Sequence, residues 1–239
     1  MRVASLLSSL MAASGCADPA DDPVEIDPFD VERRCTPPPG VGGSPQRIAD
    51  VVELVNALPM PVTLPCVLEA LDRPLSMVAA LSPFSAQQSE VQESPRMFLF
   101  APELTMSVVP IGEGRALLEL AQYVAPGRSL KGELEFPIEG PLSPSAPYED
   151  LEVAGISKCG VCHADEVTAT EVDGWPTYVS EALAPDPENE LSIAFVEQYA
   201  RACDADDDPD RCAMLLALFA HGDVVPGEFP AGTLVCIGS

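Results

Sequence analysis

The stretch SLKGELEF, residues 129–136, alternates between two kinds of side chain. Its even-numbered positions hold Leu, Gly, Leu and Phe, and the odd-numbered positions between them hold Lys, Glu and Glu. Successive side chains of a β-strand point to opposite faces, so this period of two gives one apolar face and one charged face. The stretch therefore predicts a strand that packs its apolar face on a core.

Short apolar or alternating segments lie on both sides of this strand, and Pro, Gly and Ser separate them. Their regular spacing is typical of an antiparallel β-domain. We therefore predict a β-rich domain over residues 46–153, folded as a sandwich or a small barrel. The further runs cover residues 62–68, 75–81, 96–100, 104–110, 115–123 and 148–153.

Apolar residues are spaced as in amphipathic helices at residues 46–58, 189–202 and 210–220. Pro59 stops the first of these helices, and Asp208 can cap the start of the third. The strand signal fades after the β-rich domain. Residues 154–239 are therefore predicted to be a small, mostly helical region, and the fold class is α+β.

The charge balance excludes several classes of function. The chain of 239 residues has 12 Lys and Arg against 38 Asp and Glu, a formal net charge of −26. Such a surface repels phosphate backbones and anionic lipid, so we expect no nucleic-acid partner and no charge-driven membrane docking. The 26 prolines argue against a long-helix or coiled-coil protein, because proline cannot continue a helix.

Residues 1–15 have the pattern of an export signal. Arg2 supplies a positive charge, residues 3–13 are a short apolar run, and small residues precede Cys16. This pattern resembles the signal of bacterial lipoproteins, which implies cleavage before Cys16 and lipidation of its thiol. Ala13 stands where that family usually has Leu, so an ordinary signal peptide with an incidental Cys16 is the alternative.

Residues 16–45 are rich in acidic residues and proline. This composition buries too little apolar surface to offset chain entropy, so we predict a disordered tether. Export of the chain would place it in the periplasm or at the cell surface, where disulfides persist.

Residues 159–163 read Cys-Gly-Val-Cys-His, the spacing of a haem-attachment motif. Two thiols two residues apart can add to the vinyl groups of one haem, and the next residue places an imidazole under the iron. The motif resembles that of c-type cytochromes. The resemblance implies one covalent haem c, with Cys159 and Cys162 as attachment points and His163 as the proximal iron ligand.

The distal iron ligand is less defined by the sequence. His221 and Met214 both follow the motif, and His221 is favoured because imidazole is a strong ligand and a loop permits its approach. His221 could equally interact with free carbonyls at a helix C-terminus, and Met214 could be a core residue. A third alternative is a five-coordinate iron without a distal ligand.

Three other interpretations of the motif remain. Cys-Gly-Val-Cys also resembles the dithiol of thioredoxin-like oxidoreductases, although no βαβ pattern surrounds it. A zinc site could combine Cys159, Cys162 and His163 with His221, but the second half of the usual zinc spacing is missing. A structural disulfide between Cys159 and Cys162 is the third interpretation.

The other cysteines suggest disulfides. Cys203 and Cys212 bracket an acidic loop and form a natural local pair. Cys66 could pair with Cys35 or with Cys236, and spacing alone does not decide between them.

These observations favour an exported lipoprotein that carries one haem c and transfers single electrons. A basic protein is the expected redox partner, and the lipid anchor is the expected contact with the membrane. The alternative is a surface-anchored, β-rich binding module with structural disulfides and no haem. The common hydrolase, nucleotide and zinc-protease motifs are absent from the sequence, so no catalytic residue is assigned and a non-catalytic role is favoured.

Overall fold

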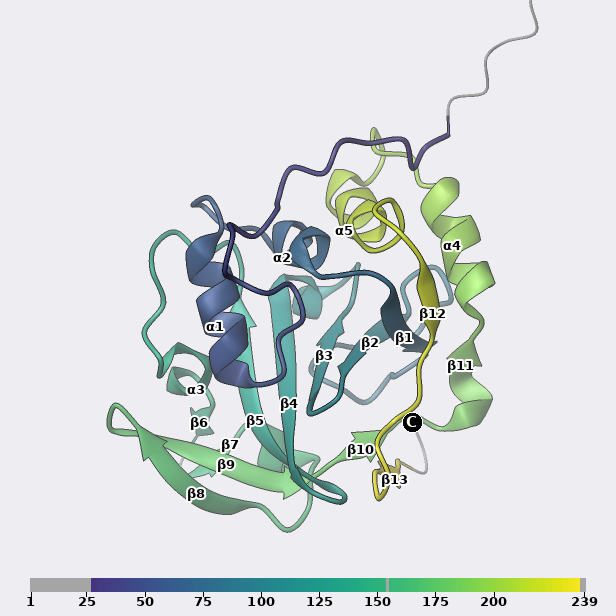
Figure 1. Ribbon diagram of the computed structural model, residues 1–239. Coiled ribbons are helices and arrows are strands. Elements are labelled where there is room, and N and C mark those ends of the chain that lie inside the picture. The colour runs from purple at the N-terminus through teal and green to yellow at the C-terminus, as the bar shows by residue number, and fades with distance from the viewer. Residues whose placement is uncertain (1–26, 154, 237–239) are drawn as a thin grey trace, which may run out of the picture.

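The centre of the computed structural model, which describes residues 27–153 and 155–236, is one twisted β-sheet (Figure 1). Within these residues nine strands belong to the sheet, in the order β11-β1-β2-β3-β4-β5-β9-β8, with β12 also paired to β1. Neighbours run antiparallel, except that β12 is parallel to β1. The strands are β1 (Leu75–Ala80), β2 (Arg96–Ala101), β3 (Leu104–Val108), β4 (Leu117–Ala125), β5 (Arg128–Glu135), β8 (Val167–Val172), β9 (Trp175–Glu181), β11 (Glu190–Leu191) and β12 (Val224–Pro226).

Two small strand pairs lie beside the sheet, β6 with β7 and β10 with β13. Helices cover one face of the sheet, with α1 lying over β4 and β5 (Figure 1). None of the helices in the described part of the chain has both the length and the apolar composition of a membrane span. The remaining bounds are β6 (Glu152–Val153), β7 (Ile156–Ser157), β10 (Leu183–Ala184), β13 (Leu234–Val235), α1 (Ile48–Ala57), α2 (Leu64–Ala70), α3 (Ala146–Glu149), α4 (Ile193–Arg201), α5 (Pro209–Phe219), and the 3-10 helices η1 (Glu113–Ala116), η2 (Cys159–Val161) and η3 (Pro187–Asn189).

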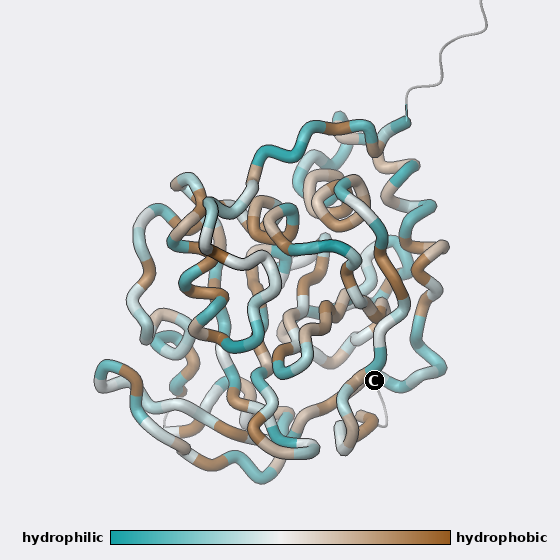
Figure 2. The backbone as a smooth tube through the Cα atoms, in the orientation of Figure 1, coloured by the Kyte–Doolittle hydropathy of each residue, from teal (hydrophilic) through white to brown (hydrophobic). Residues whose placement is uncertain are grey.

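The core lies between the helices and the sheet. Alternate residues of β2–β5 face it, and the register aligns Leu99, Met106 and Leu120 in one row across three strands. Ile48 of α1 and Leu218 of α5 pack against this layer and are almost fully buried. In Figure 2 the apolar positions concentrate on the strands and helices around the middle of the molecule. Burial of these aliphatic side chains drives the fold.

The opposite face of the same strands is polar. The register aligns Phe98, Ser107, Glu119 and Glu133 in one row across β2–β5. The C-terminal segment crosses this face, where Phe229 packs edge-to-face on Phe98 at 5.1 Å between ring centroids. The polar face is therefore partly covered, and the cavity described below lies on it.

The α+β class is confirmed, and most predicted elements are present. The strand expected at residues 62–68 is instead the helix α2, because Thr63 caps its first turn by accepting from the N–H of Cys66 and Pro65 fits that turn. The run at residues 148–153 is divided between α3 and β6.

The C-terminal part differs more from the expectation. The hairpin of β8 and β9 joins the main sheet through pairing of β9 with β5, so the sheet crosses the predicted boundary at residue 153. Residues 155–236 thus contribute strands as well as α4 and α5. Within the described residues, nine strands form a single sheet and the other four form two short pairs, so no second large sheet packs on the first.

Residues 27–45 differ from a free tether, and we call this segment the strap. The Arg33 guanidinium donates to the carbonyl oxygens of Glu69 and Leu71, both at 2.8 Å. Near its start, Phe29 stacks on Phe219 of α5. The strap lacks regular secondary structure but is bound to the helices. The predicted signal peptide and the lipidation site Cys16 lie outside the described residues.

Two disulfides stabilise the fold. Cys35 of the strap is bonded to Cys66 of α2, and Cys203 is bonded to Cys212 of α5. The local pair and one of the two pairings considered for Cys66 are confirmed. Structural disulfides are typical of proteins that fold outside the cytosol.

Candidate functional site

The Cys-x-x-Cys-His motif forms a tight turn between β7 and β8. The N–H groups of Cys162 and His163 both donate to the carbonyl oxygen of Cys159, at 3.1 and 2.9 Å. Ser157 supports the turn because its hydroxyl oxygen accepts from the N–H of Gly160 at 3.0 Å. Glu166 in turn accepts from the N–H of Ser157 at 2.8 Å. The turn is therefore held by two polar side chains that flank the motif.

Gly160 leaves room for the carboxylate of Glu166 in this turn. A Cβ atom at this position would lie 2.6 Å from a carboxylate oxygen of Glu166. The close approach of Glu166 to the backbone thus depends on the missing side chain. The two thiols that flank Gly160 differ in exposure, since Cys159 is half-buried and Cys162 is exposed. Neither thiol is in a disulfide.

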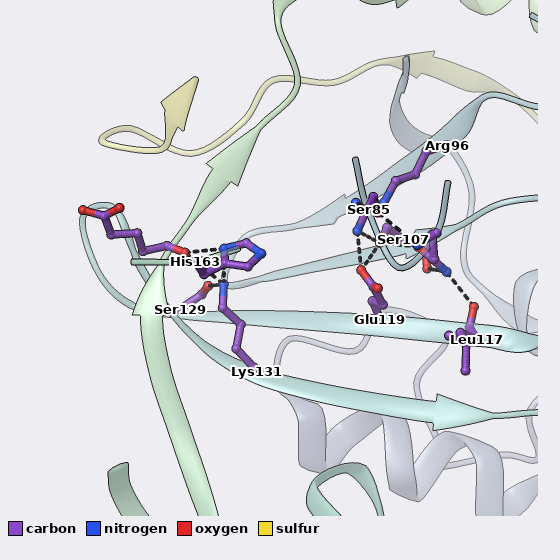
Figure 3. A network of polar contacts seen from close by, with 10 residues as sticks. Ser85, Arg96, Ser107, Leu117, Glu119, Ser129, Lys131 and His163 are labelled. Atoms are coloured by element: carbon purple, nitrogen blue, oxygen red, sulfur yellow. Dashed lines mark hydrogen bonds and ion pairs between the residues drawn. The ribbon is translucent and has the colours of Figure 1, made fainter. Parts of the chain in front are cut away.

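The imidazole of His163 is fixed by one carbonyl group. Its Nδ1 lies 2.8 Å from the carbonyl oxygen of Glu181, at the end of β9. The carbonyl oxygen can only accept, which favours a proton on Nδ1, whereas the Lys131 ammonium 3.3 Å from the same atom can only donate, which favours a proton on Nε2. Figure 3 shows the second ring nitrogen on the side of the ring that faces Glu119 and Arg96. Burial, together with the nearby Lys131, lowers the pKa of His163 to about 4, so the neutral ring prevails at pH 7.

Lys131 of β5 lies directly beside this imidazole (Figure 3). Its ammonium donates to the hydroxyl of Ser129 at 2.8 Å and to the Glu181 carbonyl at 3.1 Å. The Nζ atom also lies 3.3 Å from Nδ1 of His163. The residue is only 4% exposed, and this burial lowers the pKa of Lys131 to about 8. The ammonium is therefore still mostly charged at pH 7.

The motif opens on a cavity over the polar face of the sheet. Two adjoining hollows have volumes of about 70 and 150 Å³, and Cys159 and His163 line both. Cys162 lines the larger hollow, so all three motif side chains meet there. Phe84 and Leu183 add apolar surface to its wall. Both hollows are smaller than the roughly 300 Å³ or more that is typical of small-molecule sites.

The far wall of the cavity is a network of polar side chains around Arg96 (Figure 3). The guanidinium donates to Ser85 at 2.7 Å and to Ser107 at 2.9 Å, and forms a close ion pair with Glu119. Buried Gln87 accepts from the Ser107 hydroxyl at 2.8 Å. These contacts satisfy most of the polar groups in this shielded wall, and the buried Nε of Arg96 is left without a hydrogen-bond partner.

This network leads to a prediction on stability. Arg96→Met should lower the free energy of unfolding by about 3 kcal/mol, because it leaves the Glu119 carboxylate without the guanidinium that pairs with it in a shielded wall. The matched control is Arg115→Met, since Arg115 pairs with Asp210 at 3.5 Å on the surface and both side chains are more than half exposed. That variant should lose less than about 1 kcal/mol. Urea unfolding measures both, and equal losses would contradict the prediction.

The thiol of Cys159 is not activated. Burial, with the nearby Glu119 carboxylate, raises the pKa of Cys159 to about 11. Thiols that act as nucleophiles in thioredoxin-like enzymes have lowered pKa values, because the thiolate is the reactive form. This environment therefore argues against the dithiol interpretation of the motif.

The structure does not bring His221 or Met214 to the motif. His221 lies in the helical layer, where its Nε2 is 3.8 Å from a carboxylate oxygen of Glu69 in α2. Met214 of α5 is 3% exposed and belongs to the core between helices and sheet. The sheet separates this core from the polar face that carries His163. Neither residue can serve as the distal ligand in this arrangement, and the expected role of His221 as a metal ligand is not supported.

The position of His221 away from the motif also argues against the zinc site. Across residues 27–153 and 155–236, no group of three or more His, Cys, Asp or Glu side chains is placed to hold a metal ion. The four ligands that the sequence suggested are divided between the two faces of the sheet.

The donor groups, unlike the volume of the hollow, match a covalently attached haem c. This group needs two free thiols and one imidazole around a single cavity, and Cys159, Cys162 and His163 supply these groups. Iron-binding histidines generally donate their second ring nitrogen to a carbonyl or carboxylate, and Nδ1 of His163 lies 2.8 Å from the carbonyl oxygen of Glu181.

The sequence did not predict which residues outside the motif line the cavity. The alternation of residues 129–136 placed Lys131 and Glu133 on one face of a strand. It gave no sign that this face would be covered or that Lys131 would contact His163. Comparison with known proteins found no family model, no curated protein and no solved structure that matches this chain.

Proposed function

We propose that the protein is an exported one-electron carrier with one covalent haem c, attached through Cys159 and Cys162 and with His163 as an iron ligand. One observation carries the proposal: the three motif side chains line the same hollow, with both thiols outside any disulfide. The spacing of the motif and the geometry of the cavity support the same chemistry independently.

Each residue of the site would have a defined task. The two thiols would fix the position of the group, and His163 would present Nε2 to the iron. The apolar wall with Phe84 and Leu183 would limit contact with water. A haem held there supplies one-electron redox chemistry, while axial ligation, burial and nearby charges set its potential.

Export is part of the proposal. The two disulfides favour an oxidising compartment, which is also where haem attachment to c-type cytochromes takes place. The lipoprotein-like signal and Cys16 would tie the chain to a membrane by a lipid, at the cell surface or in the periplasm. The net charge of −26 favours a basic redox partner, and association with it should weaken as salt increases.

The decisive experiment is periplasmic expression of the full chain together with a haem-maturation system. A haem stain that persists in a denaturing gel, and a reversible change in the visible spectrum on reduction, are expected. The double variant Cys159→Ala/Cys162→Ala should lose both signals. A wild-type protein without covalent haem under these conditions would overturn the proposal.

A second candidate is a surface-anchored binding module without haem. The polar network around Arg96 favours it, because a few fixed polar side chains in the wall of a hollow are typical of sites that orient a small polar ligand. The same expression experiment separates the two, since the binding module would mature with no stain.

A further inference from the structure

We propose that the cavity binds a small monocarboxylate, held by the ammonium group of Lys131. The inference names a ligand class for the binding module given above as the second candidate, and it rests on that candidate and not on haem. The distribution of basic residues points to this cavity. The chain has only two lysines, Lys131 and Lys158, and both line the cavity together with Arg96. Three of the 12 basic residues thus meet at one place, in a chain with a formal net charge of −26.

The charges in the cavity wall do not cancel. The Glu119 carboxylate forms a close ion pair with Arg96, and the Glu133 carboxylate pairs with Lys158 at 2.9 Å. These are the only carboxylates that line the two hollows in the described part of the chain. Lys131 forms no ion pair within residues 27–153 and 155–236. Two ion pairs and one further ammonium leave the wall with one positive charge.

The ammonium of Lys131 is buried among neutral groups. Its side chain belongs to a residue that is only 4% exposed, and its hydrogen bonds to Ser129 and to the carbonyl of Glu181 use two of its three N–H groups. The thiol of Cys159 stays protonated at pH 7, so it supplies no negative charge. Buried charges are normally paired, because an uncompensated charge away from water is costly. A bound anion would supply the missing partner.

The third N–H group is available to such an anion. The neighbouring acceptor in the described residues is Nδ1 of His163 at 3.3 Å, which is longer than the two other contacts of the ammonium. A carboxylate oxygen forms a shorter and stronger hydrogen bond with an ammonium than a neutral acceptor does. One carboxylate also matches the single positive charge of the wall, whereas a divalent anion would bring a second charge without a partner.

The size of the cavity limits the ligand to a few heavy atoms. The smaller hollow, beside Lys131, has a volume of about 70 Å³, more than the roughly 15 Å³ that one water requires. Phe98, Leu120 and Phe229 add apolar surface to its wall. The adjoining hollow is lined by Phe84, which is 72% exposed, so the cavity can be reached from solvent on that side. A carboxylate with a short alkyl tail therefore matches both the charge and the apolar lining.

The two lysines permit a direct test by NMR. The full chain is labelled with carbon-13 at the lysine ε carbons and expressed without a haem-maturation system, so each lysine gives one signal. Sodium propionate is added at pH 7, and sodium sulfate keeps the ionic strength constant. The Lys131 signal should shift along a saturable curve, and the Lys158 signal should show no saturation. The absence of a saturable shift at Lys131, or the same shift with sulfate alone, would overturn the inference.

Two variants assign the signals and serve as a matched pair. Lys131→Met keeps the apolar stem and removes the charge. Lys158→Met/Glu133→Gln removes an ion pair from the same wall and leaves its net charge unchanged. Each variant retains a single lysine signal, so either of them identifies both signals of the wild type. Only the double variant should keep the saturable shift.

Urea unfolding provides a second readout. At a propionate concentration ten times the dissociation constant from NMR, the ratio of folded to unfolded wild-type protein should increase about elevenfold. The double variant should show the same gain, and Lys131→Met should gain less than about twofold. An equal gain in Lys131→Met would contradict the role of this ammonium. Haem enters neither measurement: the haem stain decides whether the protein is a haem-free binding module, and the propionate titration decides the class of ligand.

Discussion

Intact-mass analysis of the exported wild-type protein is expected to show a gain of about 616 Da over the processed polypeptide, the mass of one haem bound by two thioethers. The reason is geometric. Cys159 and Cys162 are not disulfide-bonded, they line one cavity, and the imidazole of His163 lines the same cavity. Cys159→Ala/Cys162→Ala should abolish the gain completely.

The chain offers a matched control for this experiment. Cys236 lines the same cavity but does not belong to the motif. Cys236→Ala should therefore keep the full gain in mass. A wild-type mass about 2 Da below the value for two disulfides would instead reveal a third disulfide and refute haem attachment.

Removal of the bond between Cys35 and Cys66 is expected to cause the largest loss of stability. The bond joins residues separated by 31 positions, so it restricts the unfolded chain more than a local bond does. The chain-entropy estimate for a loop of this length is about 3.7 kcal/mol. Urea unfolding of Cys35→Ala/Cys66→Ala should show a loss of this size.

The bond between Cys203 and Cys212 provides the comparison. Its partners are separated by only nine positions, and the same estimate gives about 2.7 kcal/mol. Cys203→Ala/Cys212→Ala should therefore be the more stable of the two double variants. The reverse order would mean that the strap is held mainly by its noncovalent contacts, such as those of Arg33 with Glu69 and Leu71.

Local sequence patterns predicted the strands and helices whose apolar residues follow one clear spacing. The alternation in residues 129–136 gave β5, and the helical spacing before Pro59 gave α1. The segment that forms α2 was predicted as a strand, because its apolar residues are nearly continuous and fit a strand as well as a helix. Its capping residue Thr63 and the following Pro65 were the signals that favoured a helix.

The hairpin of β8 and β9 was missed for a different reason. All residues of β8 except Val172 are exposed, so this edge strand lacks the apolar face that makes a strand recognisable. Its place in the sheet depends on pairing of β9 with β5, a contact between segments about 50 residues apart. Such long-range pairing leaves no trace in local spacing.

Only the three motif residues of the candidate site were predictable from the sequence. Cys159, Cys162 and His163 carry a pattern that is readable by spacing alone. The neighbours Lys131 and Arg96 come from other strands, and the register of the sheet brings them to the cavity. The proposed distal ligand His221 failed for the same reason, because distance along the chain does not indicate which face of a sheet a residue occupies.

The path of the strap determines how the molecule would face its surroundings. Its first described residue, Asp27, is paired with Arg201 of α4 at 2.8 Å, at the end of the molecule where α4 and α5 meet (Figure 1). Leu183 and Ala184 of β10 line the cavity, and β10 lies at the opposite end of the molecule (Figure 1). Any support tied to the N-terminal side would therefore hold the protein by the end that is away from β10.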